Sequence, residues 1–247
     1  MNNKNAIVIG ASAGLGRSLS IELAKYGVSQ ITICSSDLRD LLLLKKHIET
    51  LYNIRVNCLE LKFDSNYSTA DKVVTLINKQ KINLIYFPIG YSCNDGLINK
   101  NFNLSKYILD VNFVNIAYIC SSVFKSEIKI RNILFVGFGS IASARGRSTN
   151  VFYSLSKRAL RSYFESLNHA LGDSKSNVQY YELGYLDTTL AVGNTKFFKP
   201  ANVDQIAKKI ISNINKGSIF AYLPSYWFLI MIIIKLIPNY FFKKLKF

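Results

Sequence analysis

The chain has 247 residues, of which 49% are hydrophobic and only 4 are proline, a composition that predicts a packed globule and excludes a disordered chain. It carries 31 basic and 15 acidic residues, so its net charge is +16. This excess suits nucleic acid, anionic lipid or phosphorylated substrates as partners.

Targeting and metal signals are weak. The apolar stretch before Gly10 is too short for a signal-peptide core, so we expect residence in the cytoplasm. The four cysteines form no C-x-x-C pair and lie in or beside apolar runs, which predicts buried free thiols in a reducing compartment. The two histidines have no Cys or His nearby at ligand spacing, so no metal site is expected.

In chain order, short apolar runs alternate with segments of helical length. The predicted strands are 6–9, 31–34, 56–61, 84–87, 133–138, 178–183 and 219–223, and the first predicted helices are 15–26, 38–51 and 69–77. This alternation is typical of βαβ units, and continuous apolar runs indicate strands buried on both faces. We therefore predict an α/β fold with a Rossmann-like, doubly wound parallel sheet, over residues 1–223, and a hydrophobic basic tail, 224–247.

A glycine-rich turn follows the first predicted strand and precedes a helix, with glycines at positions 10, 14 and 16. Bare backbone there can approach a pyrophosphate, whose charge is favoured by the helix N-terminus. The context of strand, turn and helix predicts a dinucleotide site.

Tyr153 and Lys157 are four residues apart at the start of a predicted helix, so they share one face. A nearby cation stabilises an ionised phenol, so we expect Lys157 to lower the pKa of Tyr153. An ordinary helical turn is the alternative for this pair.

Together these motifs resemble the short-chain dehydrogenase/reductase family, over about residues 5 to 223. The resemblance implies a catalytic tetrad of Asn112, Ser140, Tyr153 and Lys157. Ser143 is an alternative to Ser140, but it lies three residues after the position that the family spacing to the tyrosine requires. The resemblance also implies a dinucleotide site, which includes Gly10, Ser12, Gly14, Leu15, Gly16, Ser35, Ser36, Asp64, Gly90, Tyr153, Lys157 and Thr188.

The resemblance implies a mechanism as well. Ser140 would hydrogen-bond a substrate carbonyl oxygen and Tyr153 would protonate it, while Lys157 would hold the ribose and Asn112 a water. Two positions depart from the family pattern: Ile9 replaces a threonine, and the loop after the fourth strand is Phe87-Pro-Ile-Gly90. We expect these segments to exchange a polar contact for an apolar one.

The end of the second strand bears on cofactor choice. Ser35 and Ser36 stand where an acidic residue would select NAD(H), with Asp37 slightly later and Arg17 and Arg39 within reach. We therefore expect NADP(H) rather than NAD(H), and with it the direction of carbonyl reduction.

The carboxyl-terminal segment is hydrophobic and basic. Pro224 ends the last strand, Ser225 is a candidate helix cap, and the helix predicted over 226–237 is too short to span a bilayer. Its aromatic residues and its lysines 235, 243, 244 and 246 favour a hairpin on an anionic membrane surface. A subunit interface in a homo-oligomer is the alternative.

The substrate is less constrained. Members of the family that reduce lipid-linked keto-sugars or other lipid ketones resemble this arrangement, so we expect a lipophilic ketone, reduced at the inner face of the membrane. The segment 188–200 is a candidate lid, in which Lys196 and Lys199 could meet a phosphate and Phe197 and Phe198 an acyl chain. The alternatives are a soluble oligomeric reductase of small polar ketones and a non-catalytic, dinucleotide-binding membrane scaffold. No helix-turn-helix or zinc pattern supports nucleic acid.

Overall fold

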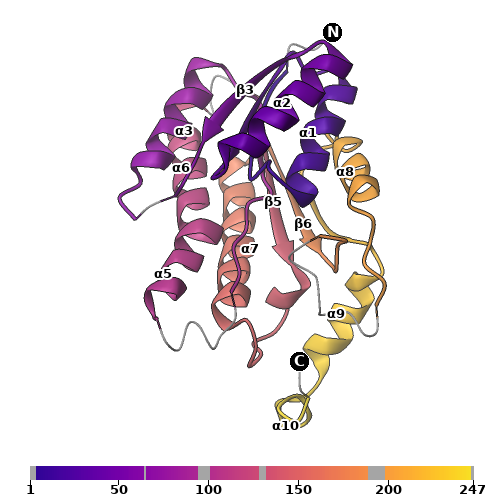
Figure 1. Cartoon of the computed structure of the whole chain (residues 1–247). Coiled ribbons are helices and arrows are strands. Elements are labelled where there is room, and N and C mark those ends of the chain that lie inside the picture. Colours follow the sequence, from indigo (N-terminus) through magenta and orange to yellow (C-terminus); the bar gives the residue numbers. More distant parts are fainter. Residues whose placement is uncertain (1–3, 64, 94–100, 128–131, 189–197, 246–247) are drawn as a thin grey trace.

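The protein is built on a parallel seven-stranded sheet, shown in Figure 1. The computed structural model describes residues 4–63, 65–93, 101–127, 132–188 and 198–245. The strand order is β3-β2-β1-β4-β5-β6-β7, and the strands are β1 (Asn5–Ile9), β2 (Gln30–Ser35), β3 (Arg55–Glu60), β4 (Leu84–Phe87), β5 (Leu134–Ser140), β6 (Asn177–Leu183) and β7 (Ile219–Leu223). The predicted Rossmann-like sheet is confirmed.

Helices cover both faces of this sheet. One face packs against α1 (Gly14–Tyr26), α2 (Leu38–Tyr52) and α8 (Val203–Ile211), and the other against α3 (Ser68–Lys79), α6 (Asn115–Glu127) and α7 (Val151–Leu171). In β1, Ala6 and Val8 belong to the first core, whereas Ile7 and Ile9 belong to the second. Successive strand side chains point to opposite faces, so a strand covered on both sides needs apolar residues throughout.

A continuous helical segment starts near the carboxyl edge of the sheet and runs along one of its faces. It consists of α5 (Asn103–Leu109), a π-helical turn η1 (Asp110–Val114) and α6. By length and composition alone, its segment Asn103–Ser126 could cross a membrane, and half of its most apolar window is buried inside the protein. Since α6 and η1 contact α3 and α7, the apolar character of this segment is explained by core packing.

The tail forms α9 (Trp227–Leu236) and α10 (Asn239–Phe242). It extends below the sheet in Figure 1, on the side to which the strand arrows point. The predicted helix is confirmed to within one residue at each end, but the predicted Ser225 cap is wrong, because Tyr226 occupies the N-cap position and no side chain caps the helix.

The prediction for the cysteines holds in part. All four are free thiols, and Cys34 and Cys120 are buried, but Cys58 and Cys93 are only half-buried. Cys58 lies in β3, the edge strand, whose second side has no neighbouring strand among the described residues. No group of potential metal ligands occurs in the described parts of the chain.

Candidate active site

The glycine turn closes tightly on its own backbone. A Cβ on Gly16 would lie 1.8 Å from the carbonyl oxygen of Gly10, so only glycine permits α1 to start this close to β1. The backbone amides of Gly10 and Ala11 both donate to the Cys34 carbonyl of β2, at 2.8 and 2.9 Å. The turn is therefore fixed against the neighbouring strand before any ligand binds.

The other predicted parts of this turn are also placed. Ser12 is half-buried, Leu15 is buried in the core, and Gly14 has a φ of +50°. A Cβ on Gly14 would lie 3.1 Å from the Thr188 methyl group, so Thr188 lies over the turn. At Ala13 no side chain caps α1, which leaves the helix N-terminus available to an anion.

The two departures from the family pattern lie together. Gly10 has a φ of +101°, and a Cβ there would approach the backbone of Ile89 to 2.7 Å. Ile9 and Phe87 are fully buried in one apolar core, against which Ile89 packs. The two segments therefore lie side by side within one apolar core.

Ser140 and Tyr153 meet at the carboxyl edge of β5. Ser140 is the last residue of β5, Tyr153 lies in the first turn of α7, and their side chains are hydrogen-bonded. The Ser140 hydroxyl also accepts a bond from the Ala142 amide at 3.2 Å. Ser143 turns away and donates instead to Glu182, so the structure brings Ser140, not Ser143, to the tyrosine.

The pKa of Tyr153 is not lowered. Burial raises the pKa of Tyr153, and the opposing effects of the Ser140 hydrogen bond and the Arg147 charge are smaller. The expected lowering by Lys157 is therefore wrong for the protein alone, since desolvation penalises the phenolate more than its surroundings stabilise it.

Lys157 is almost fully buried at the same edge. Its ammonium donates to the carbonyl oxygens of Ile89, at 3.3 Å, and Phe138, at 3.1 Å. Burial lowers the pKa of Lys157 to about 8, although Glu182 acts in the opposite direction. A Cβ on Gly90 would lie 3.6 Å from this ammonium and 3.9 Å from Oδ1 of the Asn112 side chain, so Gly90 borders both side chains.

Asn112 is held in the π-helical turn. Its amide oxygen accepts from the Tyr91 amide at 2.7 Å, while its amide nitrogen donates to the Tyr91 carbonyl at 2.8 Å and to the Ser156 hydroxyl at 3.1 Å. Both N–H donors of the side chain are thus occupied, and the amide clamps the loop after β4 to α7. Such π-helical turns often occur at functional sites.

The end of β2 is shaped by local hydrogen bonds. Ser35 is buried and accepts from the Asp37 amide at 3.2 Å, whereas Ser36 is exposed. Asp37 caps α2 and forms an ion pair with Arg39 at 3.0 Å. The Arg39 charge therefore offsets the carboxylate that follows the strand.

Some predicted residues lie outside the described ones. These are Asp64, most of the candidate lid, with Lys196 and Phe197, and the tail residue Lys246. Of the lid's aromatic pair, Phe198 is described and contacts Trp227, with ring centroids 4.8 Å apart.

A buried acid beside the site was not predicted from the sequence. Glu182 is 2% exposed, accepts from Ser143 at 3.3 Å and pairs with Arg161 at 3.0 Å. Burial raises the pKa of Glu182, and Arg161 partly opposes this. Glu182 stands near the end of a predicted strand, just before Leu183-Gly184. The sequence pattern alone does not show whether an acidic residue in that place is buried or exposed to solvent.

Arg145, in the loop between Ser140 and α7, is a second residue that the sequence did not predict. Its guanidinium donates to the Ile234 carbonyl at 3.0 Å, to the Ile237 carbonyl and to the Asn239 side chain, and it stacks on the Phe242 ring at 3.9 Å. These contacts hold the tail against the loop that follows Ser140.

A parallel sheet with strand order 3-2-1-4-5-6-7, a glycine turn after β1 and a tyrosine–lysine pair at its carboxyl edge defines an NAD(P)-dependent oxidoreductase. The comparisons with known proteins agree. The family model for short chain dehydrogenases matches residues 4–197, and the chain belongs to this family.

Several relatives are similar over most of the chain. Dehydrogenase/reductase SDR family member 7 of Mus musculus is 25% identical over 215 residues, which cover 85% of this chain and 61% of the mouse protein. The 3-oxoacyl-(acyl-carrier-protein) reductase FabG of Buchnera aphidicola is 24% identical over 212 residues, 85% of each chain. Among solved structures, a short-chain dehydrogenase from Sphingobium yanoikuyae in complex with NADPH has a TM-score of 0.81 at 15% identity, covering 92% of this chain and 91% of that one.

Proposed function

We propose that the protein reduces a lipophilic ketone with NADPH at a membrane surface, through Ser140, Tyr153, Lys157 and Asn112. The observation that carries the catalytic part is the hydrogen bond between Ser140 and Tyr153, with Lys157 one helical turn further along α7. A glycine turn that fits a pyrophosphate lies at the same sheet edge.

When bound, the nicotinamide supplies the hydride that adds to the carbonyl carbon. Negative charge then develops on the carbonyl oxygen, where the Ser140 hydroxyl donates a hydrogen bond and the Tyr153 hydroxyl donates its proton. The product is an alcohol, and Tyr153 is left as a phenolate that must regain a proton from solvent.

Lys157 and Asn112 support this transfer. The Lys157 ammonium stabilises the transient phenolate, and it would hold the ribose hydroxyls beside Gly90. Because both N–H donors of the Asn112 side chain are occupied, the water that reprotonates Tyr153 would bind the Asn112 backbone carbonyl.

NADPH is favoured over NADH by the charges after β2. Arg39 is 89% exposed, and its ion pair with Asp37 offsets the carboxylate that would repel a 2′-phosphate. The neighbour from Sphingobium yanoikuyae, in complex with NADPH, adds support from a shared fold.

The membrane part of the proposal rests on the tail. Large apolar side chains are strongly exposed along α9 and α10, and these are Phe228, Leu229, Ile232, Ile233, Leu236, Tyr240 and Phe241. Lys235, Lys243 and Lys244 lie among them, and no acidic residue follows Asp204. Apolar area with flanking lysine is the composition of a helix that lies in an anionic membrane surface. In this proposal residues 1–223 are the catalytic domain and 224–247 the membrane segment.

Catalysis is tested with Tyr153→Phe. This variant keeps the ring but removes the proton donor, so turnover of a ketone should fall by a factor on the order of 10² to 10⁴ with NADPH binding nearly unchanged. Turnover close to that of the wild type would refute the assigned role.

Membrane binding is tested by flotation with vesicles that contain phosphatidylglycerol. Leu229→Ser with Ile233→Ser removes two side chains that are each 64% exposed, so the fold should survive while vesicle binding falls at least tenfold. Leu42→Ser with Leu43→Ser, on α2, is the matched control, because these leucines are also exposed but lie away from the tail. If both variants float equally well with the vesicles, the tail does not mediate membrane binding.

A further inference from the structure

A polar cavity of about 200 Å³ lies between α7 and the tail, next to the candidate active site. It is lined by Ser143, Ala144, Arg158, Arg161, Ser162, Glu165, Glu182 and Lys235. Its volume exceeds the roughly 30 Å³ share of one water molecule several-fold, so it can admit a small polar group.

The charges in this cavity do not all cancel. Arg161 pairs with Glu165 at 2.8 Å and with Glu182 at 3.0 Å, so one positive charge is shared between two carboxylates. Arg158 and Lys235 form no ion pair or hydrogen bond with any other side chain that the structure describes. Three cations thus face two carboxylates, which leaves the cavity with a net charge of +1, although the Lys235 charge also acts on Glu182.

Lys235 also lies at the edge of the exposed apolar face. It follows Met231, which is 4% exposed, by four residues, and Phe228, which is 52% exposed, by seven residues. Residues at these spacings are neighbours on a helix, so Lys235 lies between the buried and the exposed rows of α9. When an amphipathic helix buries its apolar face in a bilayer, a cation in this position lies at the level of the phosphates.

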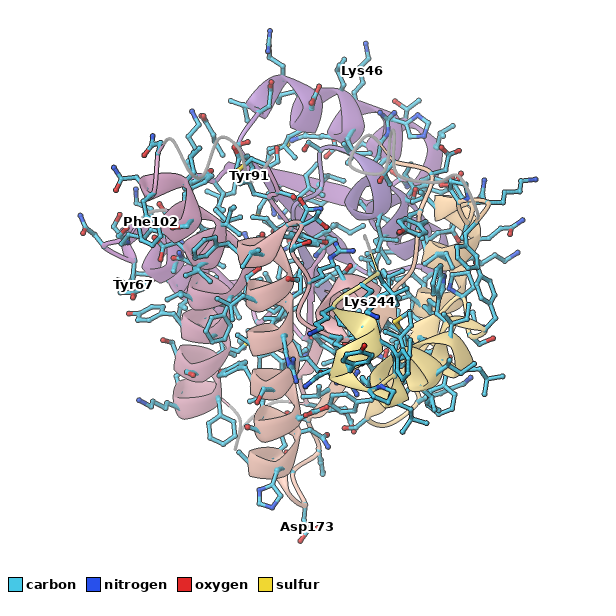
Figure 2. All side chains as sticks on the ribbon, turned by 90° about the horizontal axis from the view of Figure 1, so that it is seen from below. Lys46, Tyr67, Tyr91, Phe102, Asp173 and Lys244 are labelled. Atoms are coloured by element: carbon cyan, nitrogen blue, oxygen red, sulfur yellow. The ribbon has the colours of Figure 1, made fainter. Side chains whose placement is uncertain are left out.

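Arg145 fixes this geometry from the protein side. It binds the carbonyls of Ile234 and Ile237, which flank Lys235 in sequence, and so anchors the C-terminal end of α9 to the loop after Ser140. Figure 2 views the protein from this end, with the tail helices in yellow and Lys244 near the middle of the view. Because the backbone around Lys235 is held, a ligand in the cavity does not have to order the tail.

We propose that this cavity binds the phosphate group of an anionic phospholipid, with Arg158 of α7 and Lys235 of α9 as its two charged donors. The inference rests on the proposed membrane function and identifies the place at which a lipid headgroup would bind. Acyl chains would then lie along the exposed face of α9, and the bound headgroup would lie beside the loop between Ser140 and Tyr153.

The test is a titration with vesicles of phosphatidylcholine, with and without phosphatidic acid, read by flotation. Arg158→Gln with Lys235→Gln should weaken binding to the anionic vesicles about 30-fold, if each cation contributes as basic residues at membrane surfaces do, and leave binding to neutral vesicles unchanged. Lys45→Gln with Lys46→Gln removes the same net charge from α2, and Figure 2 shows Lys46 far from Lys244. This control should change binding by less than about threefold.

The outcomes separate the possible failures. Equal weakening in the two double variants would overturn the site, because the attraction would then depend only on net charge. If inorganic phosphate at constant ionic strength stabilises the lipid-free wild type against heat, the Arg158→Gln, Lys235→Gln variant loses this effect, and both proteins bind anionic vesicles equally, the ligand is a soluble phosphate and the lipid assignment is wrong. A wild type that binds neither vesicle refutes the membrane part of the proposed function itself. Thermal unfolding of each variant without lipid reports whether its fold is intact.

Discussion

Replacing Lys157 by methionine tests the electrostatics of the site without any ligand. Burial lowers the pKa of this ammonium from 10.5 to about 8 in the folded protein. As the pH rises above 8, the folded state therefore loses this proton first, and the unfolded state binds more protons up to about pH 10.5. The free energy of unfolding must then increase with pH across that window, and this stabilisation is lost as the pH falls through 8.

The magnitude follows from the width of the window. Between pH 7 and pH 9 only about one pH unit lies above the folded pKa, so Lys157 contributes about 1.3 kcal/mol of added stability over this interval. Lys157→Met has no titrating group, and its loss of the bonds to Ile89 and Phe138 does not depend on pH.

The assay is urea unfolding of both proteins at pH 7 and pH 9 without nucleotide. Because every other titrating group is common to the two proteins, the difference between their free energies of unfolding isolates Lys157. This difference should move in favour of the wild type by about 1.3 kcal/mol at the higher pH. A difference that stays constant between the two pH values would show that the Lys157 pKa is not lowered, and the account of a desolvated ammonium would be wrong.

Two other substitutions probe the turn and the buried acid. Gly16→Ala places a Cβ 1.8 Å from the Gly10 carbonyl oxygen, so NADPH binding, measured by nucleotide fluorescence, should be lost. Gly146→Ala is the control and should bind NADPH normally, because a Cβ there has nothing within 4 Å. Unimpaired NADPH binding by Gly16→Ala would contradict the tight turn. Glu182→Gln removes a charge that raises the pKa of Tyr153, so the pH profile of alcohol oxidation should shift to lower pH. Glu165→Gln, an exposed partner of the same arginine, is its control, and an unshifted Glu182→Gln profile would separate this acid from the tyrosine.

The sheet was predictable because its strands carry a physical signature. A parallel strand with helices on both sides needs apolar side chains on both faces, and the run Ala6–Ile9 has them. The glycine turn was predictable for a similar reason, since Gly16 is required by a backbone contact that its spacing already implies.

The side-chain environments were less accessible. The pKa of Tyr153 depends on how far its ring is desolvated, which no spacing along α7 reveals, so the expected lowering of this pKa was wrong. Arg145 acts on residues about ninety positions later, and nothing local marks it. Ser225 was predicted as the cap because serine is typical of helix N-caps and follows Pro224, which ends the last strand. The prediction failed because α9 starts one residue later than predicted, and no side chain caps it.

The absence of a side chain at Gly139 constrains how this sequence can change. A Cβ there would lie 2.3 Å from a Glu182 carboxylate oxygen and 2.6 Å from the Tyr180 hydroxyl. Alanine at 139 would therefore displace the Glu182 carboxylate and the Tyr180 hydroxyl from their present positions. Because Glu182 pairs with Arg161 at 3.0 Å, this displacement would also disturb the buried ion pair beside the candidate catalytic serine.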